Sequence, residues 1–199
     1  MVFQHLELSN YFNRLLLHFQ LTQHQSADGD RDYLNRCLEF YKNCNIYAVG
    51  EHVRENDLQY VLPKLLKKYN PDILIVTGHD SINKNADLKN INNYKNSKNF
   101  VKAVHIARDY EKSHEKLVII AGACQSDYES LIKSGANFAS SPKRINIHAL
   151  DPAIIASTIA LTEKGKEIDL IKLLDKTKYG KDGIGGLKSN GMMYVGYPR

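Results

Sequence analysis

The sequence predicts an α/β fold: a doubly wound, mostly parallel sheet with helices on both faces, in a three-layer sandwich of flavodoxin-like or caspase-like type. Two continuous apolar runs, residues 73–76 and 117–120, have the length and composition of parallel strands that are buried on both faces. Segments with apolar residues at helical spacing alternate with such strands. Right-handed β-α-β crossovers of this kind place helices on both sides of a sheet.

The chain is long enough to form one domain with a full-sized core. It has 199 residues, of which 43% are hydrophobic and 25% charged, and these proportions favour a globular fold over disorder. We therefore expect a single domain over residues 1–199. Within it, residues 1–27 are expected to be an irregular segment or the remnant of an N-terminal region.

The other strand-like segments are short. A first strand is expected at residues 15–19 and a second at 46–50, and further short apolar segments occupy residues 137–140 and 145–149. The tail, residues 180–199, is rich in glycine and is expected to form a small hairpin or an edge strand.

The helices are predicted from their apolar periodicity and from capping residues. Their expected ranges are 31–42, 57–69, 100–107, a helix that begins just beyond Cys124 and ends at Gly135, and 151–162. Ser97, the Ser126-x-x-Glu129 capping box and the pair Asp151-Pro152 are the expected N-terminal signals.

Composition and charge argue against several functions. The net charge is +5, but the basic residues are scattered, so nucleic-acid binding is not expected. The three cysteines form no C-x-x-C pair, which argues against a disulfide framework or a zinc site and favours a reducing compartment. No stretch is long and apolar enough to cross a membrane, and residues 1–21 lack the cleavage site of a signal peptide. We expect a cytoplasmic protein with no metal, cofactor, nucleic acid or membrane partner.

Each of the two central strands is followed by a residue with catalytic chemistry. Residues 71–80 end in Thr-Gly-His79-Asp80, and residues 117–126 end in Gly-Ala-Cys124-Gln-Ser. In an open α/β sheet the chemistry lies outside the carboxyl ends of the strands, so both side chains should emerge at the same edge. We predict that Cys124 is a nucleophile and that His79 is its base or ion-pair partner. The histidine precedes the cysteine by 45 residues, in the chain order of caspases, whose spacing is about fifty residues.

Small and polar residues around Cys124 are expected to receive the substrate. Gly122 and Ala123 would let a substrate backbone approach, the following helix N-terminus would favour a thiolate, and nearby backbone N–H groups would form an oxyanion hole. We assign Gly78 to the same substrate-binding surface. Gln125 is assigned there too, although caspases place their glutamine before the cysteine.

Acidic residues at the same edge would select a basic side chain. Asp28 and Asp30 follow the first predicted strand, which lies next to the third in a doubly wound sheet. Asp80 and Asp127 are alternatives. Each of these carboxylates also has a simpler interpretation as the cap of a turn or a helix.

Other interpretations remain open. His148 is a rival base, whereas His105 and His114 are expected on helix surfaces and Cys37 in the core as a small hydrophobe. A catalytically silent, receiver-like α/β binding module is the alternative function, because residues 134–142 resemble the end of a phosphoacceptor module. A receiver would bind Mg²⁺ through an acidic cluster.

Several stretches are longer and more distinctive than a cysteine–histidine pair. They occupy residues 28–34, 71–80, 94–98, 121–126 and 135–152. Together with a Gly-Ile-Gly-Gly segment at residues 183–186, these stretches resemble the YabG family of sporulation-specific peptidases from spore-forming Firmicutes.

The resemblance implies a cysteine-type endopeptidase. Cys124 in Gly-Ala-Cys-Gln-Ser would be its nucleophile and His79 in Thr-Gly-His-Asp its base. The resemblance further implies that the substrates are spore coat and related precursor proteins, cleaved after basic residues and after arginine in particular. The protein would then act in the sporulating cell in association with the spore coat. Its oligomeric state and any self-cleavage are left open.

Overall fold

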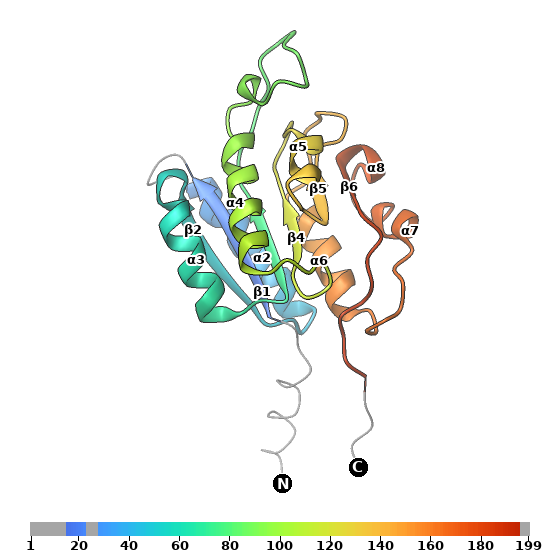
Figure 1. The fold of residues 1–199 in the computed structure, drawn as a ribbon. Helices are drawn as coiled ribbons and strands as arrows, with labels where there is room; N and C mark the ends of the chain where they lie inside the picture. The colour runs from blue at the N-terminus through green and yellow to red at the C-terminus, as the bar shows by residue number, and fades with distance from the viewer. Residues whose placement is uncertain (1–14, 23–27, 196–199) are drawn as a thin grey trace.

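The sheet has six strands in the order β2-β1-β3-β4-β5-β6 (Figure 1). The structure is a computed structural model and describes residues 15–22 and 28–195. Strands β1 to β5 run parallel, and β6 pairs antiparallel with β5. The strands are β1 (Leu16–Thr22), β2 (Ala48–Arg54), β3 (Ile73–Thr77), β4 (Val118–Ala121), β5 (Phe138–Ser140) and β6 (Ile184–Gly186). The first five have the flavodoxin-like order of a doubly wound sheet, which confirms the predicted fold class.

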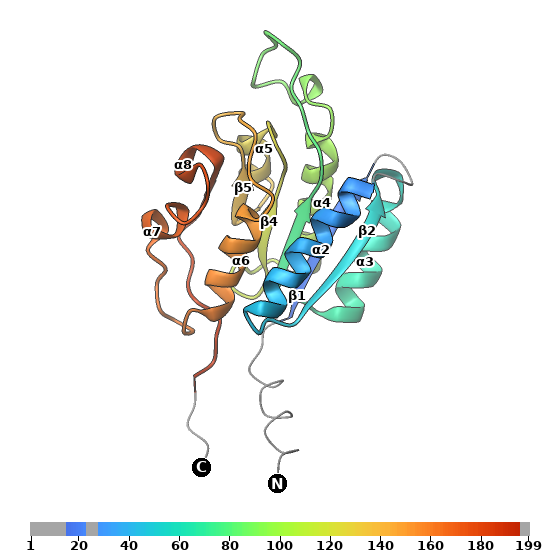
Figure 2. The same cartoon turned by 180° about the vertical axis from the view of Figure 1, so that it is seen from behind.

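Helices cover both faces of the sheet (Figures 1 and 2). One layer consists of α3, α4 and α5, and the other of α2 and α6 with the short α7 beside them. The helices are α2 (Asp28–Asn43), α3 (Leu58–Tyr69), α4 (Ser97–Tyr110), α5 (Tyr128–Lys133), α6 (Asp151–Leu161), α7 (Leu170–Leu174) and α8 (Gly180–Gly183). Among the residues that the structure describes, no helix is long and apolar enough to cross a lipid bilayer.

The two helical layers bury the central strands completely. Successive side chains of a strand point to opposite faces. Leu17 and Leu74 therefore pack in the core beneath α3 and α4, whereas Leu16 and Ile73 pack in the core beneath α2 and α6. All residues of β3 are buried. Burial on both faces explains why this strand appears in the sequence as an unbroken apolar run.

Several elements extend beyond their predicted ranges. β1 and β2 pair along seven positions, up to Thr22 and Arg54, and the polar residues near their ends hide this length from the sequence. The N-terminal segment predicted to be irregular contains β1, and its residues 1–14 and 23–27 lie outside the described residues. α2 begins at Asp28, earlier than predicted, and α7 is an element that the sequence pattern does not predict. The edge strand expected in the tail is β6.

The helix starts differ slightly from the predicted caps. The N-cap of α5 is Asp127 rather than Ser126, and Ser97 and Asp151 are the first residues of α4 and α6 rather than their caps. The physical reason is that the hydroxyl groups of Ser97 and Ser126 are engaged elsewhere, by a buried carboxylate. Gly135 follows α5 with a φ of 110°, so the predicted glycine stop is confirmed.

A polar cluster lies between β1 and α2. His18 is fully buried, and its Nδ1 and Nε2 atoms lie 3.1 Å from the Tyr41 hydroxyl and 2.8 Å from the Thr77 hydroxyl. Burial, together with the nearby His52, lowers the pKa of His18 to about 3. The imidazole is therefore neutral at physiological pH and is satisfied by two hydroxyl groups.

Acid should destabilise the fold through His18. The unfolded chain takes up a proton near pH 6.5, whereas folded His18 does so only near pH 3. Stability is therefore lost as the pH falls from the unfolded to the folded pKa, by about 2–3 kcal/mol between pH 7 and pH 4.5. Urea denaturation at these two pH values should show a shallower decrease for His18→Gln, whose amide still forms hydrogen bonds but does not titrate. Equal decreases for both proteins would contradict a neutral buried histidine.

Candidate active site

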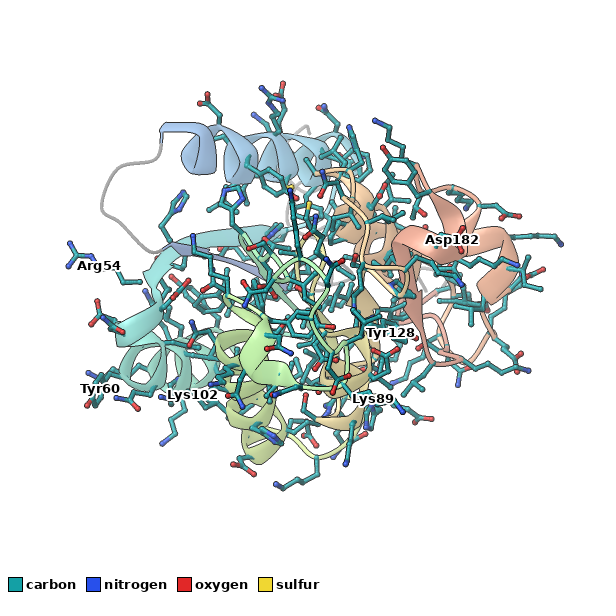
Figure 3. All side chains as sticks on the ribbon, turned by 90° about the horizontal axis from the view of Figure 1, so that it is seen from above. Arg54, Tyr60, Lys89, Lys102, Tyr128 and Asp182 are labelled. Atoms are coloured by element: carbon teal, nitrogen blue, oxygen red, sulfur yellow. The ribbon has the colours of Figure 1, made fainter. Side chains whose placement is uncertain are left out.

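The loops after β3, β4 and β5 meet at the carboxyl edge of the sheet, which Figure 3 shows from above. We call them the β3 loop (residues 78–96), the β4 loop (residues 122–127) and the β5 loop (residues 141–150). The β3 loop, which carries the labelled Lys89, projects beyond the sheet (Figure 1). All the site residues expected from the two central strands lie in the β3 and β4 loops.

His79 and Cys124 occupy equivalent positions on neighbouring strands. Val76 of β3 pairs with Ala121 of β4, and each candidate lies three residues beyond its member of this pair. The Gly122 N–H donates to the Val76 carbonyl at 3.0 Å, which continues the pairing by one residue. Neighbouring strands are about 4.8 Å apart, so the pairing delivers both residues to the same part of the edge. His79 is exposed, and Cys124 is partly exposed.

The Cys124 thiol lies against the β5 loop. Its Sγ atom is 3.4 Å from the Ile147 nitrogen, whose N–H donates to the sulfur, and 3.9 Å from the Ile147 carbonyl oxygen. Tyr33 of α2 is close enough to interact electrostatically with Cys124.

Cys37 of α2 is a contrasting thiol that contacts the same loop. Its Sγ lies 3.8 Å from the Ala149 carbonyl oxygen, and the residue is fully buried in the core beneath α2 and α6. Burial raises the pKa of the Cys37 thiol to about 12. Cys37 is therefore an unreactive core residue, as predicted.

Most backbone N–H groups of the β4 loop are already used. Those of Gly122 and Ala123 donate to the Val76 carbonyl and to the Ser126 hydroxyl, and that of Ser126 donates to the Ala123 carbonyl. The Gln125 N–H donates to the β5 loop. Within the described parts of the chain, the N–H of Cys124 has no acceptor. It is thus the donor of this loop that remains for an oxyanion.

The small residues of the edge have structural roles. Gly122 has a φ of 110°, and a Cβ atom there would lie 2.9 Å from Leu131 and 3.2 Å from the Ser140 side chain. Glycine is therefore required for the turn that leads from β4 to Cys124. Ala123 is also buried, and Gly78 is half-buried beside His79.

Gln125 bridges the β3 and β5 loops. Its Oε1 accepts from the Ile82 N–H at 3.3 Å, and its Nε2 donates to the Asn146 Oδ1 at 3.4 Å. Its backbone N–H is shared between the Ile145 carbonyl and the Ser141 hydroxyl, both at 3.1 Å. The β3 and β5 loops thus both hold Gln125, the residue that follows the candidate nucleophile.

Asp80 joins the β3 loop to the β4 loop. Its Oδ1 accepts from the backbone N–H groups of Ser81 and Asn96, both at 2.8 Å. Its Oδ2 accepts from the hydroxyl groups of Ser97 and Ser126. Asp80 is only 8% exposed, and burial raises the pKa of its carboxyl group while these hydrogen bonds lower it. Both carboxylate oxygens are therefore engaged within the protein.

The other acidic residues predicted at the site lie outside the β3 loop. Asp28 and Asp30 lie in the first turn of α2, which follows β1 and so begins at the same edge of the sheet. Asp127 is buried, and its carboxylate caps α5 by accepting from the Ser130 N–H. Within the residues whose side chains are described, no group of three or more His, Cys, Asp or Glu residues could hold a metal ion.

Of the other histidines considered as candidates, His105 lies where it is expected, whereas His148 and His114 do not. Residues 145–149 form no strand, because their backbone groups bond to side chains and to the β4 loop. His148 is exposed there, and its Nδ1 accepts from the Leu150 N–H at 3.3 Å. His105 is exposed on α4, whereas His114 lies beyond the end of α4 rather than on a helix.

A cavity of about 830 Å³ lies at the opposite end of the sheet. Its lining includes Tyr110 at the end of α4, His114 before β4, Lys164 after α6 and Tyr194 in the tail. Since ligands of doubly wound folds bind at the carboxyl ends of the strands, we place the candidate site at the edge with His79 rather than in this cavity.

The sequence does not reveal the residues that organise the edge. These are Ser97, Ser126, Ser141 and Arg144, and each of them connects two of the three loops through a hydrogen bond to a residue far away in the chain. The sequence indicates Ser126 and Ser141 only weakly, as polar residues that follow an apolar strand.

Comparisons with known proteins identify relatives of this chain. A family model described as YabG peptidase U57 matches residues 19–198. The sporulation-specific protease YabG of Bacillus subtilis (strain 168) is 44% identical over 172 residues, which make up 86% of this chain and 59% of that protein. The chain thus spans less than two thirds of the length of this relative.

Loss of the Asp80 carboxylate should destabilise the edge. Asp80→Asn places an amide NH₂ among four donors, so we expect the free energy of unfolding to fall by about 2–4 kcal/mol in urea denaturation. Asp87→Asn is the matched control, because Asp87 accepts from the Lys89 N–H in an exposed part of the same loop, and it should change stability by less than about 0.5 kcal/mol. Equal stabilities of the two variants would contradict the central role of Asp80.

Proposed function

Because the chain belongs to the YabG peptidase family, we propose that it is a cysteine-type endopeptidase with Cys124 as nucleophile and His79 as base. The observation that carries this proposal is the pairing of β3 with β4, which places both residues at equivalent positions. The partial exposure of Cys124 and the exposure of His79 leave them accessible to a protein substrate.

The proposed mechanism uses the side chains and backbone amides of the edge. The His79 imidazole accepts the proton of the Cys124 thiol, and the thiolate attacks the carbonyl carbon of the scissile peptide bond. The Cys124 N–H donates to the resulting oxyanion. The intermediate collapses to a thioester as the imidazolium protonates the leaving amine. His79 then activates a water molecule, which hydrolyses the thioester and restores the thiol.

We further propose that cleavage follows basic residues, arginine in particular. Asp28 and Asp30 begin α2 at the same edge as Cys124, and carboxylates there would pair with a guanidinium. The proposed substrate-binding surface is completed by Gly78, Gly122, Ala123 and Gln125. Of these, Ala123 and Gln125 contribute through the turn that holds the proposed nucleophile.

The proposed substrates are spore coat and related precursor proteins. The relative from Bacillus subtilis is called a sporulation-specific protease, which supports activity in the sporulating cell. We place the protein in the cytoplasm of that cell, in association with the spore coat, and propose no nucleic-acid or membrane partner.

The alternative is a catalytically silent, receiver-like module. It is favoured by the sheet order, which receiver modules share. A receiver binds Mg²⁺ through acidic residues, so tight and saturable Mg²⁺ binding without peptidase activity would support it.

Substitution of either catalytic residue should abolish peptidase activity. The purified protein is incubated with a spore coat extract, and new N-termini are sequenced by mass spectrometry. We expect termini that follow arginine with the wild type. Cys124→Ala and His79→Ala should lower the cleavage rate by more than about 10³-fold, because they remove the nucleophile and its base.

Cys44→Ala is the matched control, since Cys44 is a half-buried thiol remote from the edge, and it should leave the rate unchanged. Unchanged cleavage by Cys124→Ala would refute the assignment of the nucleophile. New termini after residues other than arginine would refute the specificity alone.

A further inference from the structure

Arg144 connects the β5 loop to the β3 loop and to α5. Its Nε donates to the Tyr94 hydroxyl at 2.6 Å, and its guanidinium lies 5.6 Å from the centre of the Tyr94 ring. A terminal nitrogen bonds to Glu129 and lies 3.6 Å from Asp127. The Arg144 side chain is only 10% exposed. These donors are directed at the protein's own groups, so the guanidinium is not presented to a substrate.

Tyr94 fixes the far end of the β3 loop. Its hydroxyl donates to the Leu88 carbonyl at 2.9 Å, and Tyr94 itself forms an isolated β-bridge with Ile82. Ile82 in turn donates to the Gln125 side chain. The contact between Arg144 and Tyr94 therefore holds the part of the β3 loop that bonds to Gln125, the residue after Cys124.

Arg144 also fixes the turn that receives the β4 loop. A terminal nitrogen donates to the Ser141 carbonyl at 3.4 Å and to the Pro142 carbonyl at 3.1 Å. The Ser141 hydroxyl and the Ile145 carbonyl are the two acceptors of the Gln125 N–H. Arg144 thus fixes the turn that carries the Ser141 hydroxyl, which also donates to the Ile145 carbonyl.

Backbone strain is concentrated at the same place. Gln125, Ser141 and Arg144 have φ values of 57°, 66° and 55°. The other non-glycine residues with positive φ in the described ranges are asparagines, which tolerate this conformation more readily. Strained residues persist where surrounding contacts determine the geometry, and they cluster at functional sites.

We propose that Arg144 is a positioning residue for the peptidase reaction: with Tyr94 it latches the β3 loop to the β5 loop and so holds Cys124 in its reactive position. The proposal rests on the proposed function, since it assumes that Cys124 is the nucleophile. Arginine is required because its planar guanidinium serves an aromatic hydroxyl, backbone carbonyls and two carboxylates together, which a lysine cannot do.

Tyr94→Phe tests the latch with the least disturbance of the fold. It keeps the ring beneath the guanidinium and removes only the hydroxyl. Tyr110→Phe is the matched control, because the Tyr110 hydroxyl bonds to Asn70 at the opposite end of the sheet. Arg144→Gly removes the guanidinium while tolerating the positive φ, and Arg144→Lys retains only the charge.

Steady-state kinetics on a peptide with arginine before the scissile bond should separate positioning from binding. We expect Tyr94→Phe and both Arg144 variants to lower kcat on the order of 10- to 100-fold with little change in KM, because the nucleophile is misplaced. Guanidinium, added far below denaturing concentrations, should restore part of the kcat of Arg144→Gly but not that of Arg144→Lys. Tyr110→Phe should match the wild type.

Two further measurements do not depend on peptidase activity. Hydrogen exchange over residues 82–95 should become faster in Tyr94→Phe and in Arg144→Gly. Alkylation of Cys124 by iodoacetamide should slow several-fold in these variants, because the Ile147 N–H is no longer held at the sulfur, while alkylation of Cys44 in the same molecules stays constant. These results would support the latch even if Cys124→Ala cleaved normally and the proposed nucleophile were wrong.

The proposal is overturned by either of two results. Exchange and alkylation that match the wild type in Tyr94→Phe would show that no latch exists. Faster exchange with unchanged kcat and unchanged alkylation of Cys124 would show that the contact only stabilises the loop. Should Arg144→Gly fail to fold, Tyr94→Phe decides between these outcomes.

Discussion

The parallel pairing of β3 with β4 is the constraint on which the site depends. Parallel strands require crossovers that pass over a face of the sheet, so every strand from β1 to β5 ends at the same edge. The two residues of interest are then placed by register, not by a local motif: Val76 pairs with Ala121, and His79 and Cys124 follow at equal distances along the chain. A shift of the register by one residue would reverse the faces of every side chain in β4 and separate this pair.

At such an edge the backbone polar groups of the loops need hydrogen-bond partners. Chain segments that leave a buried sheet carry N–H and C=O groups into partly dry surroundings, where unpaired groups are costly. The Asp80 carboxylate satisfies two backbone N–H groups and two hydroxyl groups, and Arg144 satisfies the carbonyl groups of the β5 turn. One anion and one cation thus organise different sides of the same edge, each through hydrogen bonds to several loops.

The sequence predicts the parts of this architecture that depend on local patterns. The buried strands β3 and β4 and the residues after them are recognisable because continuous apolar runs end in small residues. The cap of α5 is mispredicted because Ser126 and Asp127 are both good cap residues, and only the distant Asp80 decides between them. Residues 145–149 resemble a strand, yet their backbone bonds to Cys124 and Asp151 instead of a neighbouring strand. Contacts between residues far apart in the chain cannot be inferred from a single sequence.

The two cysteines that contact the β5 loop lie in different surroundings. Cys37 and Cys124 lie against carbonyl groups two residues apart, those of Ala149 and Ile147. Cys37 faces the closed core, where burial raises its pKa to about 12 and keeps it a thiol. Cys124 lies beyond the end of β4, partly exposed, with a backbone N–H directed at its sulfur. Of the two thiols that contact the β5 loop, Cys124 is therefore the accessible one.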